Sequence, residues 1–211
     1  SDIISLNMLF KREGPYKSFY LVNHEFIERM KPESWLINTS RGEIADTDAL
    51  LQALHKRRIQ GVVADVWENE PAINLELLKQ VFIGTPHIAG YSTDGKAMGT
   101  AMIVREASRY FGFGIDDWFP ENLPPPPRPE IITAMPGMGI PEIFADLSLK
   151  AYDIFQDSLA LKNAPARFEE FRNKYPVRRE PGALLVSTQA SNPLTDALLK
   201  HLGYGLARFR S

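Results

Sequence analysis

Three side chains could together carry out acid–base chemistry on a small acid: Arg41, Glu70 and His87. Each of them closely follows a short apolar run. A planar guanidinium can hold a carboxylate through two hydrogen bonds and polarise the adjacent carbonyl oxygen. An imidazole can take and return a hydroxyl proton, and a carboxylate that accepts its other N–H fixes its tautomer. The set suits hydride transfer between a 2-hydroxy acid and a nicotinamide, with Arg41 as anchor, His87 as acid/base and Glu70 as orienter.

These side chains need elements that bring them together. Strands are expected at residues 3–6, 35–39, 61–66 and 81–84. Nearly unbroken apolar strands that alternate with helical patterns are typical of a parallel sheet with helices on both faces. In such a sheet, ligands bind beyond the carboxyl ends of the strands. We therefore expect the three side chains to converge at one edge of a partial doubly wound parallel α/β sheet.

Capping residues mark the helices of this region, which extends to about residue 111. Asp46 and Ser92 can each accept a hydrogen bond from the first turn of a helix. Nothing interrupts the helical pattern after Ser92 before Gly112. We expect Met98 and Met102 on this helix to fill the core.

A run of prolines divides the chain. Six of the ten residues from 120 to 129 are proline, which favours an extended spacer. Residues 112–130 are therefore interpreted as a linker between a first domain, 1–111, and a second, 131–211. The second is expected to be a small α/β or α+β domain, with strands at 131–133, 183–188 and 206–209 and helices at 141–156, 166–174 and 194–202.

Composition excludes several classes of protein. The chain has 211 residues, 44% of them hydrophobic, which is enough for a folded core. A net charge of −2 gives no basic field for nucleic acid or an anionic membrane. The absence of cysteine excludes disulfides and thiolate metal sites, and no metal is expected. No run approaches the roughly 18–20 apolar residues of a membrane span, and the start does not resemble a signal peptide. We therefore expect a cytoplasmic protein whose partner is a small molecule or another protein.

The segments around the three side chains resemble the D-2-hydroxyacid dehydrogenase family in order and spacing. The matching segments are 37–46, 49–50, 63–71 and 85–90. Arg41 and Glu70 lie 29 positions apart, and His87 follows 17 positions later, where the family places its catalytic arginine, glutamate and histidine. The resemblance implies NAD as the cofactor. It also implies that residues 1–111 are the C-terminal part of a Rossmann-like NAD-binding domain and its returning helix.

The resemblance implies roles for further residues. The expected cofactor-binding residues are Thr39, Ser40, Arg41, Asp65 and Gly90, and Tyr91 is expected to touch the substrate. Asp65 also has an argument of its own, because a carboxylate inside a buried strand is costly without a polar partner. The nicotinamide carboxamide would be such a partner.

Four segments, two of which overlap those above, make the resemblance specific to one branch of the family. They are 67–71, 87–96, 151–153 and 171–180. That branch acts on a phosphorylated hydroxy acid and has its own C-terminal dimerisation domain, so the resemblance implies such a substrate and a homodimer through residues 131–211. Two alternatives stay open: another 2-hydroxy acid such as phosphoglycerate, and a truncated dimerisation module without catalysis.

Two features depart from the family pattern. Relatives carry a His-Thr-Pro-Leu-like run after the first strand, whereas this chain has Met8 and no hydroxyl there, which is expected to weaken or reshape cofactor binding. The glycine-rich phosphate loop is also missing from the sequence. The G-x-G patterns at 112–114 and 137–139 lack a third glycine and are interpreted as turns. This absence motivates the non-catalytic alternative.

Overall fold

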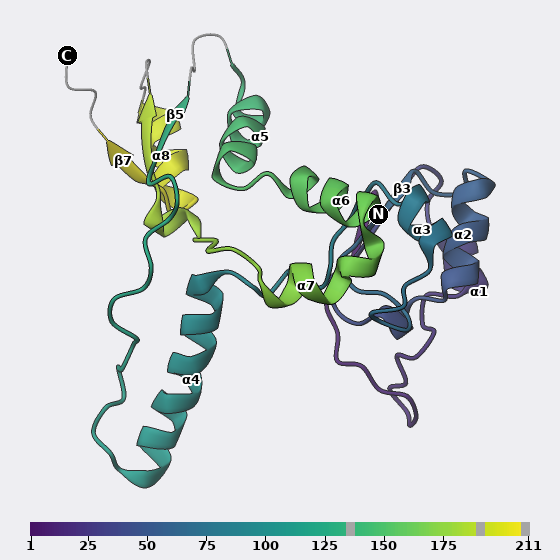
Figure 1. The fold of residues 1–211 in the computed structure, drawn as a ribbon, viewed down its shortest axis with the longest axis horizontal. Coiled ribbons are helices and arrows are strands. Elements are labelled where there is room, and N and C mark those ends of the chain that lie inside the picture. The colour runs from purple at the N-terminus through teal and green to yellow at the C-terminus, as the bar shows by residue number, and fades with distance from the viewer. Residues whose placement is uncertain (134–137, 189–192, 208–211) are drawn as a thin grey trace. The chain divides into compact units, whose positions relative to one another are not determined.

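The computed structural model describes residues 1–133, 138–188 and 193–207. The chain forms two compact units, drawn as a ribbon in Figure 1. The first unit comprises Ser1–Ala89 and Ile154–Tyr175, and the second comprises Gly90–Asp153 and Pro176–Ser211. These limits differ from the expected division into 1–111 and 131–211, because residues 90–111 belong to the second unit and residues 154–175 to the first.

A parallel sheet of four strands organises the first unit, with the strand order β1-β2-β3-β4. The strands are β1 (Ile3–Leu6), β2 (Trp35–Asn38), β3 (Gly61–Ala64) and β4 (Ile83–Gly84). The expected α/β class and parallel sheet are confirmed. Since all four strands point the same way, the loops after them leave the sheet at one edge.

Helices alternate with these strands. They are α1 (His24–Arg29), α2 (Thr47–His55) and α3 (Leu75–Gln80). The side chain of Asp46 accepts a hydrogen bond from the backbone N–H of Asp48, as its position before the helix predicts. Helix α2 packs between α1 and α3.

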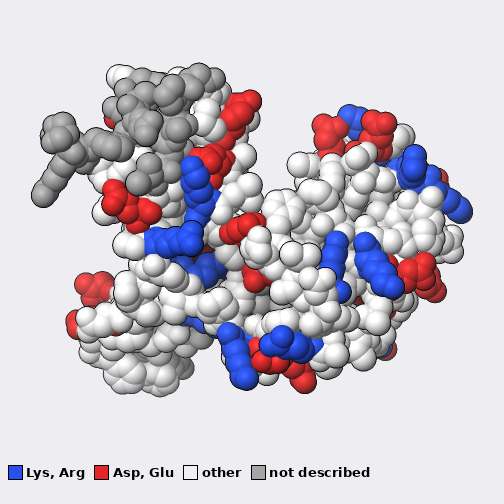
Figure 2. Space-filling view, turned by 45° about the horizontal axis from the view of Figure 1, so that its top comes forward, with Lys and Arg blue, Asp and Glu red and all other residues white. Residues whose placement is uncertain are grey.

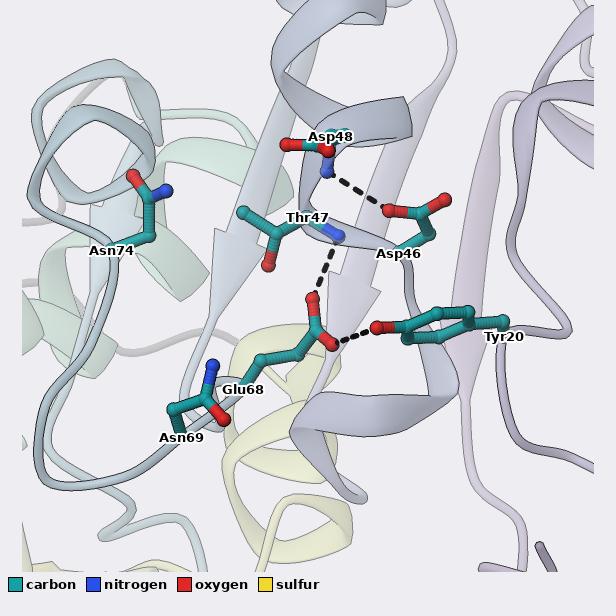
Figure 3. A pocket seen from close by; sticks show the side chains of 7 residues that line it. All are labelled: Tyr20, Asp46, Thr47, Asp48, Glu68, Asn69 and Asn74. Carbon is teal, nitrogen blue, oxygen red and sulfur yellow. Dashed lines mark hydrogen bonds between the residues drawn. The ribbon is translucent and has the colours of Figure 1, made fainter.

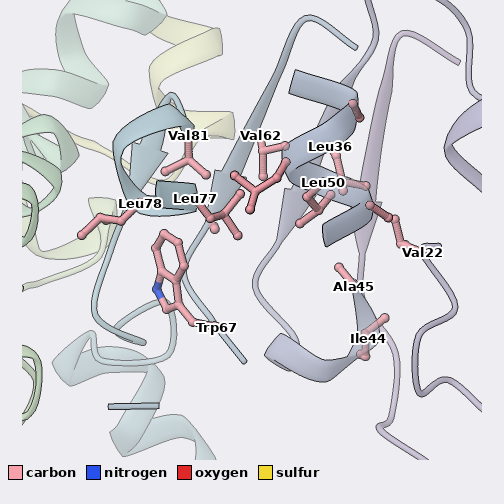
Figure 4. Close-up of a cluster of buried hydrophobic side chains, with 14 of the residues drawn as sticks. Val22, Leu36, Ile44, Ala45, Leu50, Val62, Trp67, Leu77, Leu78 and Val81 are labelled. Atoms are coloured by element: carbon pink, nitrogen blue, oxygen red, sulfur yellow. The ribbon is translucent and has the colours of Figure 1, made fainter. Parts of the chain in front are cut away.

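The core of the first unit lies between the sheet and these helices. Leu36 and Val62, which are paired across β2 and β3, have no exposed surface. Figure 4 shows the Trp67 side chain in the same cluster with Leu77 and Leu78. Burial of each large apolar side chain of this kind contributes about 1.5–3 kcal/mol. This core fixes the strand ends that carry the candidate site.

The first unit is completed by α6 (Ile154–Asn163) and α7 (Phe168–Asn173). Helix α6 lies beside β4, where the hydroxyl of Ser158 accepts a hydrogen bond from the backbone N–H of Gly84 at 3.0 Å. Leu161 of α6 belongs to the core cluster and has no exposed surface. These contacts explain why residues 154–175 belong to the first unit.

A single helix at 141–156 was expected, and this is wrong. The structure has two helices there, α5 (Ile140–Ala151) in the second unit and α6 in the first. Tyr152 ends α5 because its backbone is extended, with φ −159° and ψ 108°. The chain passes from one unit to the other at this break.

The second unit contains a three-stranded parallel sheet with the order β5-β6-β7. Its strands are β5 (Glu130–Thr133), β6 (Leu185–Thr188) and β7 (Gly205–Ala207). Helix α5 packs on β5, and α8 (Pro193–His201) packs on β7. The expected small α/β domain is confirmed, although residues 208 and 209 of its last expected strand lie outside the described part of the chain.

The longest helix of the described residues is α4 (Thr93–Phe111). Ser92 caps its start and Gly112 ends it with a left-handed φ of 71°, as the sequence predicts. The expectation that Met98 and Met102 fill the core is wrong, because they are 46% and 60% exposed. The buried residues of the helix are instead the small side chains Ala97, Ala101 and Ser108.

Basic and acidic side chains are interspersed on the face drawn in Figure 2. The sequence has nearly equal numbers of them, with 24 Lys and Arg against 26 Asp and Glu. Among the helices of the described residues, none has the length and hydropathy needed to cross a membrane.

Candidate active site

Glu70 and His87 form a hydrogen-bonded pair at the carboxyl edge of the first sheet. Nδ1 of His87 lies 2.8 Å from Oε2 of Glu70, and the two side chains are 24% and 19% exposed. The other carboxylate oxygen of Glu70 accepts a hydrogen bond from the backbone N–H of Trp67 at 2.8 Å. An ionised carboxylate only accepts hydrogen bonds, so Nδ1 carries a proton. Nε2, which has no partner among the described residues, is then the atom that can exchange a proton.

The backbone of His87 holds the imidazole at this edge. Its φ is 57°, in the left-handed region that is uncommon for residues other than glycine. Its N–H donates to the carbonyl oxygen of Asp65 at 2.7 Å. The histidine is thus placed by the loop after β4 and tied to the residue that follows β3.

Asp65 is buried, with 3% of its surface exposed, but it is not without partners in the chain. Its Oδ1 accepts hydrogen bonds from the hydroxyl of Thr85 at 2.6 Å and the N–H of Ile88 at 2.7 Å. Its Oδ2 accepts one from the N–H of Ala89 at 2.9 Å. The polar partners expected for this buried carboxylate are therefore groups of the chain itself, and its predicted cofactor role rests on the resemblance alone.

The turn that carries Arg41 is shaped by side chains around it. Asn38 donates through Nδ2 to the carbonyl oxygen of Arg41 at 3.0 Å and accepts from the N–H of Ser40 at 3.1 Å. The hydroxyl of Ser40 donates to the carbonyl oxygen of Leu6 at 2.7 Å and accepts from the N–H of Met8 at 3.2 Å. The Ser40 side chain therefore joins the ends of β1 and β2. Asn38 was not among the predicted site residues, although an asparagine at the end of a strand is a common turn former.

Arg41 itself is exposed, and its Nη1 donates to the carbonyl oxygen of Ser40 at 2.7 Å. Within the described residues, no hydrogen bond or ion pair joins it to Glu70 or His87. Its turn nevertheless lies against the loop of Glu70, because a Cβ on Gly42 would come within 1.9 Å of the carbonyl carbon of Trp67. Arg41 is thus at the same edge of the sheet, with a guanidinium open to an anionic ligand.

The remaining predicted residues lie on either side of the unit boundary. Thr39 is exposed immediately after β2. Gly90 and Tyr91 belong to the second unit, where the ammonium of Lys96 lies 3.9 Å from the centre of the Tyr91 ring. The roles of these three residues stay predictions.

A polar cavity of about 230 Å³ lies next to the loop after β3. Figure 3 shows its lining residues, which are Tyr20, Asp46, Thr47, Asp48, Glu68, Asn69 and Asn74. The hydroxyl of Tyr20 donates to Oε1 of Glu68 at 2.6 Å, and this hydrogen bond is the main cause that raises the pKa of Tyr20 to about 12. The backbone N–H of Thr47 donates to Oε2 of Glu68 at 2.9 Å. No motif surrounds Tyr20 in the sequence, so its place beside Glu68 was not predicted.

Comparison with known proteins finds relatives of both units. Residues 1–89 match the family described as D-isomer specific 2-hydroxyacid dehydrogenase, NAD binding domain. The erythronate-4-phosphate dehydrogenase of Bacteroides fragilis is 43% identical over 182 residues, which are 86% of this chain and 49% of that protein. The erythronate-4-phosphate dehydrogenase of Cronobacter sakazakii is 38% identical over 207 residues, 97% of this chain and 54% of that protein.

Among solved structures, a glyoxylate reductase from Paecilomyes thermophila is similar, with a TM-score of 0.44 and 28% identity over 51% of this chain and 32% of that one. The chain spans about half the length of the two erythronate-4-phosphate dehydrogenases. The matching family domain points to NAD as the cofactor. Residues 1–89 are therefore homologous to the NAD binding domain of D-isomer specific 2-hydroxyacid dehydrogenases, and most of the chain is homologous to part of erythronate-4-phosphate dehydrogenases.

Proposed function

We propose that the protein containing this chain is an NAD-dependent oxidoreductase that converts 4-phospho-D-erythronate to its 2-oxo acid, a step towards pyridoxal phosphate. The observation that carries the proposal is the 2.8 Å contact between His87 Nδ1 and Glu70 Oε2. It leaves Nε2 ready to accept a hydroxyl proton. The names of the relatives support the choice of substrate.

Each of the three side chains has a separate task in this reaction. Nε2 of His87 takes the proton of the C2 hydroxyl, and Glu70 stabilises the imidazolium that forms. Arg41 binds the substrate carboxylate and polarises the oxygen at C2. Bound NAD would accept the hydride from C2.

The residues at the carboxyl edge of the sheet fit the nicotinamide end of that cofactor. Thr39 and Arg41 are both exposed where β2 ends, which is where an open parallel sheet binds its ligands. They would border the cofactor together with the backbone of Ser40 and Gly90, and Tyr91 would touch the substrate. Asp65 would act through its hydrogen bonds to Ile88 and Ala89, which shape the same loop.

The test is a rate measurement on the complete protein, with 4-phospho-D-erythronate and 3-phosphoglycerate compared side by side. His87→Asn keeps a residue that tolerates a positive φ but removes the base, and it is expected to lower kcat by about 10²–10⁴-fold. Arg41→Lys is expected to raise KM for the acid, because a lysine lacks the two-pronged donor set. The matched control is His24→Asn, on the exposed surface of α1, which should leave the rates unchanged. Equal turnover in His87→Asn and in the unaltered protein would refute the proposal, and faster oxidation of 3-phosphoglycerate would replace its substrate.

We also propose that the protein is a homodimer through residues 131–211. Large apolar side chains of the second unit are exposed, including Ile140 and Phe144 of α5 at 47% and 51%. Exposed apolar groups of this kind are typical of protein interfaces. Light scattering after size-exclusion chromatography should give twice the chain mass, and Phe144→Glu should give the monomer; a monomeric unaltered protein would contradict this.

A further inference from the structure

We infer that Glu68 is a positioning residue: its carboxylate fastens the loop of Glu70 to the segment that follows Arg41, and so holds Glu70 against His87. The catalytic consequence rests on the proposed function, but the contact itself does not. Three structural steps lead to this assignment.

The first step is that both oxygens of Glu68 are occupied by donors from one neighbouring region. Oε1 accepts from the hydroxyl of Tyr20 at 2.6 Å, and Oε2 accepts from the N–H of Thr47 at 2.9 Å. Figure 3 shows the carboxylate between these two donors. Charge-assisted hydrogen bonds of this kind are about twice as strong as neutral ones.

The second step is that both donors are tied to the turn after Arg41. The N–H of Tyr20 donates to the carbonyl oxygen of Glu43 at 2.9 Å, inside the short 3-10 helix η1 (Gly42–Ile44). Thr47 begins α2 three residues after η1 ends. Glu68 thus joins the loop after β3 to the turn after β2 from one side, while Gly42 contacts Trp67 directly.

The third step is that the same loop places Glu70. Only Asn69 separates it from Glu68, and Asn69 has a φ of 60°, which turns the chain sharply. Trp67 precedes them, with its indole buried and its Nε1 donating to the carbonyl oxygen of Thr85 at 2.9 Å. Glu70 therefore follows two fixed residues, and a displacement of Glu68 is transmitted to it through a single intervening residue.

Polar contacts hold the side of this loop that faces the cavity. The cavity of about 230 Å³ is lined there by Glu68 and Asn69, whereas Gly42 and the buried Trp67 pack closely on the other side. The hydrogen bond from Tyr20 to Glu68 is the main cause that raises the pKa of Tyr20 to about 12, so the phenol stays a donor at alkaline as well as neutral pH.

The test measures the tautomer of His87 by 15N NMR of the 211-residue chain, with the resonances assigned from the spectrum of His87→Asn. The unaltered chain should show the proton on Nδ1 and none on Nε2. Tyr20→Phe removes one donor and keeps the ring, and Glu68→Gln removes one of the two acceptors. Both variants are expected to lose the single tautomer and give a mixture, while circular dichroism shows an unchanged fold. Asp48→Asn is the matched control, because Asp48 lines the same cavity without a side-chain hydrogen bond to Glu68, and it should keep the tautomer.

Activity then separates this inference from the proposed function. In the complete protein, Tyr20→Phe and Glu68→Gln should lower kcat by roughly tenfold with little change in KM for NAD, as expected for a small misplacement of a catalytic group. An unchanged tautomer in both variants would overturn the positioning role and leave the proposed function standing. A tautomer change in a protein that oxidises no 2-hydroxy acid would overturn the function and leave the positioning role standing.

Discussion

Asp65 and Glu70 are both carboxylates after β3, but their surroundings give them different tasks. Asp65 is buried and accepts three hydrogen bonds, two of them from backbone N–H groups of the loop after β4. Glu70 keeps part of its surface open and accepts a hydrogen bond from Nδ1 of His87. The sequence predicts that Glu70 meets His87, because both follow strands of one parallel sheet. It cannot predict the partners of Asp65, because they depend on how the backbone at 85–89 folds back over β3.

The hydrogen bonds of Asp65 lead to a prediction about stability. Asp65→Asn keeps the size of the side chain but turns an NH2 group towards a backbone N–H. We expect a loss of about 1–3 kcal/mol in the free energy of unfolding, the usual cost of an unsatisfied buried polar group. Urea unfolding measures this loss. The control is Asp48→Asn on the exposed start of α2, and equal stability of the two variants would show that the buried network contributes nothing.

The strands and the helix-capping residues could be predicted from the sequence, whereas the end of α5 depended on tertiary contacts. The cap at Asp46 was predicted and is present, because an N-cap needs only its own first turn. The division between α5 and α6 was not predicted, because apolar residues recur at helical spacing on both sides of Tyr152 and Asp153. What ends α5 there is the transfer of the chain to another unit, which local periodicity does not encode.

Two glycines of different elements allow a matched test of close approach. Gly42 of η1 leaves no space for a Cβ, which would come within 2.0 Å of the Trp67 carbonyl oxygen, whereas Gly99 of α4 has nothing within 4 Å. Gly42→Ala is expected to lower the free energy of unfolding by about 1–3 kcal/mol. Gly99→Ala should raise it by about 0.5–1 kcal/mol, since alanine suits a helix interior better. The same sign for both variants in urea unfolding would contradict the packing of η1 on the Trp67 backbone.

Across the whole molecule, each unit is built from two separate stretches of the sequence. Residues 154–175 return to the first unit after two helices, α4 and α5, and one strand, β5, of the second. The sequence predicts a division at the prolines, because the composition marks the linker clearly. The contacts of α6 with β4 join positions far apart in the sequence, and one sequence carries no signal for them.

An ion pair inside the second unit makes the stability of the molecule depend on pH. Arg179 donates to both oxygens of Asp94, at 2.8 and 3.0 Å, and this contact lowers the pKa of Asp94 below its ordinary value of 3.8. A carboxyl whose pKa is lower in the folded state stabilises the protein above the unfolded-state pKa, and the stabilisation is lost as the pH falls through the folded-state pKa. Asp94→Asn should therefore lower the urea midpoint at neutral pH and reduce its fall below about pH 4. Asp117→Asn is the control, and an equal acid response in Asp94→Asn and the unaltered chain would contradict this account.

The left-handed backbone at His87, with its φ of 57°, affects how any mutational scan of this site should be interpreted. An alanine there would lose the imidazole and would also suffer about 1–2 kcal/mol of steric conflict between its Cβ and the backbone, which glycine avoids. We expect His87→Gly to unfold at a higher urea concentration than His87→Ala, the reverse of their usual ranking in helices. If alanine proved the more stable, the loop would have to relax on substitution. If the loop does not relax, an alanine variant at this position would combine a loss of folding stability with the loss of the base.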